Sequence, residues 1–167
     1  MSFKIAKYKY LIQPGYLLVS QEPTSVYGVT GSGVFVGLWD NSKCFSGCCS
    51  YLKPKPEKNN EGSTRYGSVA IKHLIRTMKS KGSNIRDLKA LIIGGGDNET
   101  SLFYGKENIK IAETILNYFT IEILSYDTGG SLGRKFIYDT ENGQSLTFKT
   151  KKIRQSDWYP YKTGRDS

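Results

Sequence analysis

The sequence predicts one domain that mixes helices and strands, of the α+β or mixed α/β class. Its 167 residues suit a single domain with a sizeable core. The candidate elements follow the order strands, helix, strand, helix, strands, which differs from a regular alternation of strand and helix. Hydrophobic residues make up 38% and aromatic residues 13% of the chain, which excludes a disordered chain and a membrane protein.

The N-terminal part is predicted to be rich in strands. Residues 3–12 and 16–20 are rich in β-branched, aromatic and aliphatic side chains and are separated by a Pro-Gly pair, which is typical of two short strands around a turn. The apolar run from Val34 to Trp39 indicates a buried strand. Residues 53–65, with two prolines and a Lys-, Asn- and Glu-rich stretch, are predicted to form a surface loop.

Two amphipathic helices are predicted, in residues 66–80 and 107–119. In both segments the apolar side chains recur every three or four positions and form one face. These faces comprise Ala70, Ile71, Leu74, Ile75 and Met78 in the first helix and Ile111, Ala112, Ile115, Leu116 and Phe119 in the second. His73, the single histidine, falls on the opposite face of the first helix, and Gly82 supplies a C-terminal stop.

The C-terminal half adds further strands. Residues 90–93 form a short apolar strand that ends in three consecutive glycines, and residues 121–126 alternate as a strand does until Asp127-Thr-Gly-Gly130. Residues 134–140 and 145–150 are predicted to form a hairpin. Glycines at strand ends usually mark tight turns or a close approach of two backbones, and the chain contains neither a dinucleotide nor a P-loop fingerprint. A turn in which Asp127 accepts backbone N–H bonds explains its motif without any function.

The charge and the metal-ligating residues limit the classes of partner. The chain has 24 Lys and Arg against 15 Asp and Glu, a formal charge of +9 that would attract nucleic acid or an acidic protein face. Part of this charge lies in a basic, aromatic tail, residues 151–167, which is expected to be a solvated extension of a domain in residues 1–150.

Three cysteines and one histidine are poorly suited to a zinc site, so we expect neither a metal nor a cofactor. Because no apolar leader or membrane-spanning run is visible, we expect a cytoplasmic protein without membrane insertion.

The ordered set of motifs carries more information than any single motif. In chain order the set comprises Gly31-Ser32, Asp40, Pro54, Tyr66, Ala70, Gly94-Gly95, Tyr104-Gly105-Lys-Glu-Asn108, Asp127-Thr-Gly-Gly130, Arg134 and Gly143. From Gly15 to Leu146, most of the chain, this series resembles the CheD family of chemoreceptor glutamine deamidases. The resemblance implies an α+β fold, a mixed β-sandwich with two main helices packed against it. It also implies an enzyme with a cysteine nucleophile, a histidine base and a threonine, and two partners, the cytoplasmic region of chemoreceptors and a CheC-type phosphatase.

All three catalytic positions of that family are substituted here. By the resemblance, Gly33 occupies the nucleophile position, Ser50 the base position and Tyr27 the threonine position. Glycine offers no nucleophile, and a serine hydroxyl is a poor general base near neutral pH. A one-residue gap would place Cys49 at the base position instead. The residues expected to bind or to shape the pocket are Ser32, Asp127, Thr128, Gly129 and Arg134.

These substitutions predict a CheD-like pseudoenzyme that binds a chemoreceptor or a CheC-type phosphatase without deamidating it. In one alternative, Cys48 or Cys49 supplies a relocated nucleophile. The two residues would lie on opposite faces of a strand. Neither has an evident neighbour that would activate its thiol. In a second alternative, cations interleaved with Trp158, Tyr159 and Tyr161 in the tail bind nucleic acid without sequence preference. No nucleic-acid motif accompanies those residues, so this partner is not expected.

Overall fold

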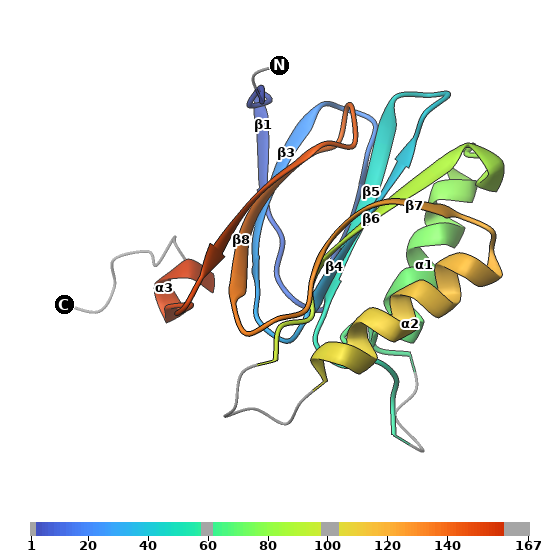
Figure 1. The fold of residues 1–167 in the computed structure, drawn as a ribbon. Coiled ribbons are helices and arrows are strands. Elements are labelled where there is room, and N and C mark those ends of the chain that lie inside the picture. Colours follow the sequence, from blue (N-terminus) through green and yellow to red (C-terminus); the bar gives the residue numbers. More distant parts are fainter. Residues whose placement is uncertain (1–2, 58–61, 98–103, 159–167) are drawn as a thin grey trace.

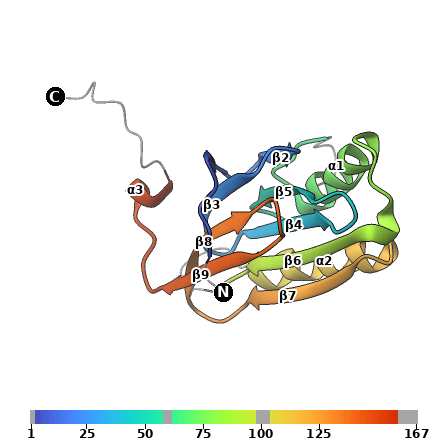
Figure 2. The ribbon, with the colours of Figure 1, turned by 90° about the horizontal axis from the view of Figure 1, so that it is seen from above.

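Two β-sheets and two helices are stacked in three layers in the structure, which is a computed structural model (Figure 1). The structure describes residues 3–57, 62–97 and 104–158. The four-stranded sheet has the strand order β1 (Tyr8–Leu11), β3 (Thr24–Thr30), β8 (Gly133–Asp139) and β9 (Ser145–Thr150). The five-stranded sheet has the order β2 (Leu17–Ser20), β5 (Phe45–Tyr51), β4 (Val34–Asp40), β6 (Leu88–Gly94) and β7 (Glu122–Thr128). Helices α1 (Gly67–Ser80) and α2 (Gly105–Tyr118) cover the outer face of the five-stranded sheet (Figure 2).

This arrangement confirms the α+β sandwich with two main helices. One apolar core lies between the five-stranded sheet and the helices and includes Val34, Cys49, Leu74 and Leu116. A second lies between the two sheets and includes Phe35, Cys48, Ile93, Phe136 and Tyr138. Because the five-stranded sheet is covered on both faces, β5 is buried along its whole length and β4 at every residue except the partly buried Trp39.

Both predicted helices are confirmed, with small shifts at their ends. The first begins at Gly67 and buries the predicted apolar face, while His73 is exposed on the opposite side. Gly82 ends it as expected: its φ of 102° is one that L side chains rarely adopt, and its N–H donates to the Lys79 carbonyl at 2.9 Å. The second helix begins two residues earlier than predicted, at Gly105.

The strands predicted around the Pro-Gly turn belong to different sheets. β1 pairs in parallel with β3, whereas β2 pairs antiparallel with β5. Strands β3 and β5 carry the least regular patterns and were not identified as elements from periodicity. In β5 all seven residues are buried, and a Cβ at Gly47 would lie 2.7 Å from Leu74 Cδ1 of α1. The small residues of this strand therefore allow the helix to pack closely.

The remaining predicted strands and the hairpin are confirmed. β8 and β9 pair antiparallel from Gly133↔Thr150 to Tyr138↔Ser145. In the turn between them Gly143 has a φ of 71°, and its N–H donates to the Asp139 carbonyl at 2.9 Å. Two short helices complete the described chain: a 3₁₀ turn, η1 (Ile85–Asp87), before β6, and α3 (Gln155–Trp158) after β9. No helix within residues 3–57, 62–97 and 104–158 is long and apolar enough to cross a membrane.

Candidate functional site

The loop that joins β3 to β4, residues 31–33, is held by the backbone of the three-glycine run that follows β6. The Gly95 N–H donates to the Gly33 carbonyl at 2.8 Å, and the Gly96 N–H donates to the Gly31 carbonyl at 2.9 Å. A Cβ at Gly94 would lie 2.4 Å from the Gly33 carbonyl oxygen, and the φ of Gly94 is 113°. The expectation of a close backbone approach at this run is therefore confirmed.

Asn108 of α2 fixes the same loop from the helix side. Its side-chain amide donates to the carbonyl of Ser32 at 2.9 Å and to the carbonyl of Leu52 at 2.8 Å. The Tyr51 hydroxyl in turn donates to the Asn108 carbonyl at 2.6 Å. Asn108 is fully buried. In the sequence analysis Asn108 is named only as part of a motif. Because it lies four residues before Ala112, it falls on the buried face of α2, and a polar residue at such a position indicates a buried hydrogen bond.

Two polar atoms without partners flank this loop. In the described part of the chain, the buried side-chain atoms that lack a hydrogen-bond partner are Thr30 Oγ1, directly before the loop, and Asn108 Oδ1 beside it. Buried polar atoms are paired in the great majority of native structures, so an unpaired one needs an explanation. Both unpaired atoms therefore belong to residues that precede or contact the loop formed by residues 31–33.

Gly33, which the family resemblance assigns to the nucleophile position, has no room for a side chain. The residue is buried, and a Cβ there would lie 2.7 Å from the Tyr51 carbonyl oxygen and 3.4 Å from Leu52 Cδ2. A real Cβ essentially never approaches backbone at 2.7 Å, so any larger residue requires the end of β5 to move. The loop geometry is thus adapted to glycine.

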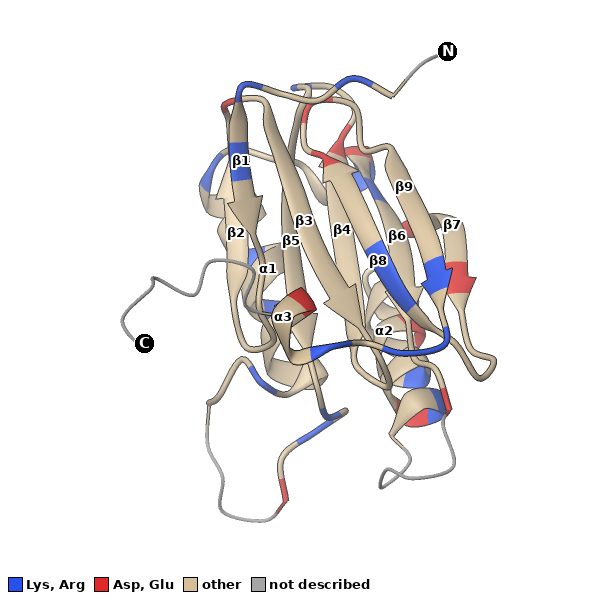
Figure 3. Ribbon diagram, turned by 90° about the vertical axis from the view of Figure 1, so that its left-hand side faces the viewer, with Lys and Arg blue, Asp and Glu red and all other residues tan. Residues whose placement is uncertain are grey.

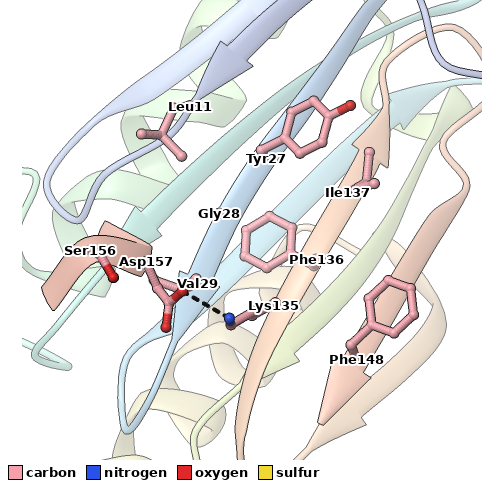
Figure 4. Close-up of a pocket in the computed structure, with 10 residues that line it drawn as sticks. All are labelled: Leu11, Tyr27, Gly28, Val29, Lys135, Phe136, Ile137, Phe148, Ser156 and Asp157. Atoms are coloured by element: carbon pink, nitrogen blue, oxygen red, sulfur yellow. Dashed lines mark hydrogen bonds and ion pairs between the residues drawn. The ribbon is translucent and has the colours of Figure 1, made fainter. Parts of the chain in front are cut away.

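Tyr27 and Ser50 do not meet Gly33 in one pocket. Tyr27 lies on the outer face of the four-stranded sheet and lines a cavity there with Leu11 and Ile137 (Figure 4). Ser50 is buried, pairs with Phe35, and follows Cys48 by two residues, so its side chain faces the layer between the sheets. The four-stranded sheet therefore separates the two side chains.

The cysteines are placed where a thiolate is disfavoured. Cys48 and Cys49 are both fully buried, and they contribute to the two different cores, as expected for neighbours on one strand. Burial raises the pKa of the Cys48 thiol well above its ordinary value and that of Cys49 to about 12. Both thiols are protonated at neutral pH, and His73 lies on the exposed face of α1. Cys44 is exposed and has a φ of 53°.

An ion pair links the two sheets beside the glycine run. Arg134 of β8 is 2% exposed; its Nε donates to Asp127 Oδ1 at 3.2 Å, and its Nη1 donates to the Leu132 carbonyl at 2.7 Å. The side chain of Asp127 thus accepts from a guanidinium group, where the sequence suggested backbone N–H donors. Thr128 pairs with Gly94, and the Gly129 N–H donates to the Gly94 carbonyl at 3.0 Å. These residues support the frame of the loop and do not line the cavity of Figure 4.

The fold and this loop define a two-sheet α+β protein with a glycine-framed site, and comparisons with known proteins identify its family. The family model described as CheD chemotactic sensory transduction matches residues 52–149, more than half of the chain. A probable chemoreceptor glutamine deamidase CheD of Sulfurimonas denitrificans is 33% identical over 143 residues, which cover 83% of this chain and 92% of that protein. The protein with the same description from Trichlorobacter lovleyi is 30% identical over 151 residues, covering 88% and 94% respectively.

This chain belongs to the CheD family of chemotaxis proteins. A more distant relative, a probable chemoreceptor glutamine deamidase CheD of Methanococcus vannielii, is 26% identical over 148 residues, covering 86% of this chain and 96% of that protein. The residues that match the family model begin at Leu52, so Tyr27, Gly33 and Ser50 all precede them.

Proposed function

We propose that this protein binds the cytoplasmic region of a chemoreceptor without deamidating it, and acts in the cytoplasm. The observation that carries the proposal is the site of Gly33, where a Cβ would lie 2.7 Å from the Tyr51 carbonyl oxygen. Hydrolysis of an amide through an acyl-enzyme needs a nucleophile and a group that takes its proton. Neither Gly33 nor Ser50 supplies these groups, whereas the three carbonyls of the loop, residues 31–33, accept hydrogen bonds from Asn108, Gly95 and Gly96.

A CheC-type phosphatase is the second partner that follows from the family resemblance. Family membership supports a chemoreceptor partner more directly, because the relatives are described as chemoreceptor glutamine deamidases. We therefore place the chemoreceptor first and treat the phosphatase as a partner to be tested beside it.

An active deamidase with a relocated nucleophile remains the alternative proposal. It would use the thiol of Cys48 or Cys49, since these are the cysteines near the substituted positions. Burial and the raised pKa of both thiols weigh against it, because a nucleophile needs access to its substrate and a populated thiolate.

One assay separates the two proposals. The full-length protein is incubated with a glutamine-bearing chemoreceptor cytoplasmic fragment, and ammonia release and the intact mass of the fragment are measured. A CheD-family protein with its Cys, His and Thr intact is the positive control, and the Cys48→Ser, Cys49→Ser double variant is the negative control. We expect no ammonia and no mass change of about 1 Da per site beside a working control, together with binding of the fragment. Turnover that the double variant abolishes would establish the alternative, and absence of binding to both partners would refute the binding proposal.

A further inference from the structure

The described part of the C-terminal tail, residues 151–158, is a strap that returns to the domain. Its Ile153 lies against the glycine loops: a Cβ at Gly133 would be 2.6 Å from Ile153 Cδ1. Lys135 of β8 forms an ion pair with Asp157 at 2.8 Å, and the Gln13 side chain donates to the Trp158 carbonyl at 3.4 Å. We call residues 151–158 the C-terminal strap. It lies beyond residue 149, where the match to the family model ends.

A cavity of about 300 Å³ lies between the strap and the loops that frame Gly33. The strap contributes Lys151, Lys152, Ile153 and Trp158 to its wall, and the loops contribute Ser32 and Ser131, among others. Ser32 directly precedes Gly33 in the loop, so the cavity opens beside the position where the family carries its nucleophile. This cavity is distinct from the apolar one of Figure 4 on the outer face of the four-stranded sheet.

The described residues that line this cavity give it a positive charge. Among them are two lysines and no acidic residue. Other cations nearby have acidic partners, since Lys135 pairs with Asp157 and Lys149 lies 3.9 Å from Asp127. Lys151 and Lys152 have no ion pair in the part of the chain that the structure describes. Figure 3 shows the link between β9 and α3, which holds both lysines, as two basic stretches separated by one short tan segment.

The lining also favours an anionic group on an apolar stem. Trp158, Ile153 and Leu132 present apolar surface, while Ser32 and Ser131 supply hydroxyls. Hydrogen bonds to charged groups are stronger than those between neutral groups, so a carboxylate gains from both the hydroxyls and the lysines. A glutamate side chain combines this carboxylate with methylene groups that apolar walls can bury. A bare inorganic anion would leave those walls without a contact.

We propose that this cavity binds a glutamate side chain of an acidic protein partner, with Lys151 and Lys152 as its counter-charges. The inference rests on the proposed function, because it names which form of the receptor region the protein recognises. A receptor site that carries glutamate fits the cavity better than the same site carrying glutamine, whose amide brings no charge. A protein that retains the frame of a glutamine deamidase would thus recognise the carboxylates that a deamidase produces at these receptor sites.

The test compares two forms of one receptor cytoplasmic fragment, with glutamine or with glutamate at the same sites. Affinity for the full-length protein is measured by titration calorimetry at fixed ionic strength. We expect the glutamate form to bind about two- to thirtyfold more tightly, the range for two exposed charge pairs. The Lys151→Gln, Lys152→Gln double variant should bind both forms equally. The Lys72→Gln, Lys79→Gln double variant removes the same charge from the exposed face of α1 and should keep the preference.

The outcomes distinguish the inference from the proposed function. Equal affinity for both forms, or a preference that survives in the Lys151, Lys152 variant, overturns the inference while leaving receptor binding intact. Absence of binding to either form overturns the proposed function. Inorganic phosphate added at constant ionic strength should reduce the preference only weakly, because it lacks the apolar stem. If phosphate abolishes the preference at millimolar concentration, the cavity is a general anion site and the assignment to glutamate is wrong.

Discussion

The side-chain amide of Asn108 donates to the Ser32 carbonyl at 2.9 Å and so connects the buried face of α2 to the loop before β4. A second hydrogen bond from the same amide reaches the Leu52 carbonyl at the end of β5. One side chain therefore connects the loop that contains Gly33 to the residue that follows β5.

Replacing Asn108 with alanine should destabilise the protein by about 1–3 kcal/mol, because two buried carbonyls lose their donor. Asn108→Asp should cost at least as much, since a carboxylate would face both carbonyl oxygens. Urea unfolding followed by circular dichroism measures the effect. Asn117→Ala, an exposed asparagine on the same helix, is the control and should change the free energy of unfolding by less than about 0.5 kcal/mol. Equal effects at the two positions would contradict this role.

Restoring a cysteine at position 33 should not create a deamidase. Gly33→Cys places a Cβ 2.7 Å from the Tyr51 carbonyl oxygen, so we expect a loss of about 1–3 kcal/mol in stability. Gly31→Ala is the matched control in the same loop, because its Cβ would have no neighbour closer than 3.9 Å. Thermal unfolding and ammonia release are measured on both variants. Ammonia release by Gly33→Cys at wild-type stability would show that the loop still accepts the nucleophile.

Thiol labelling should separate Cys44 from the other two cysteines. Cys44 is exposed, whereas Cys48 and Cys49 are fully buried with raised pKa values. At pH 8 we expect an iodoacetamide-type reagent to modify one thiol in the folded protein and three in the unfolded chain. Mass spectrometry of the digested protein identifies the labelled residue. Fast labelling of Cys48 or Cys49 under native conditions would support the alternative proposal, in which one of these thiols is the nucleophile.

The raised pKa of Cys49 also predicts a loss of stability at alkaline pH. The folded-state pKa is about 12, above the ordinary value of 9.0, so the unfolded chain ionises first and binds fewer protons as the pH rises. This contribution is complete below pH 9 and is lost as the pH rises toward 12, by up to about 1.4 kcal/mol per pH unit. The Cys49→Ala variant should lose part of this slope between pH 8.5 and 10. An identical slope in wild type and variant would refute the assignment.

Two ion pairs of different burial should respond differently to neutralisation. Asp127→Asn leaves the guanidinium of Arg134, which is 2% exposed, without its charged partner, and we expect a loss of about 2–4 kcal/mol. Glu122→Gln breaks the exposed pair with Lys89 and should cost less than about 1 kcal/mol. Chemical unfolding at low and at high salt compares them. A similar small loss in both variants would show that Arg134 finds other compensation.

The two main helices could be predicted from the sequence because their signals are local. The apolar face of α1 repeats every three or four residues, and the Gly82 stop follows it directly. Strand β5 could not be identified from periodicity because both of its faces are buried, so its pattern of Ser, Gly and Cys does not alternate, although Cys48 and Cys49 were expected on opposite faces of a strand. Strand β3 contains Gly28, which suggests a loop, yet a Cβ there would lie 2.4 Å from Phe136 Cζ of β8. That contact spans more than a hundred residues, and no local pattern reveals it.

The candidate site was predictable in its motifs but not in its geometry. The family resemblance assigned Gly33, Ser50 and Tyr27, and the structure places Tyr27 and Ser50 on opposite sides of one sheet. Which face a residue occupies depends on strand register, and register is set by pairing partners far along the chain. The C-terminal strap could not be predicted either. Ile153 contacts Gly133 because the chain reverses direction after β9, and the basic composition of the strap does not indicate this reversal.

The pairing of β3 with β8 determines when this protein can fold. Ser25 and Asp139 are partners, so the four-stranded sheet has no second neighbour for β3 until almost the whole domain has been synthesised. Closing so long a segment costs chain entropy before the contacts repay it, and proteins dominated by such pairings fold on a timescale of roughly milliseconds to seconds. During translation the edge of β3 that pairs with β8 therefore keeps unpaired backbone N–H and C=O groups, so the risk that another strand pairs there is greatest before β8 has left the ribosome.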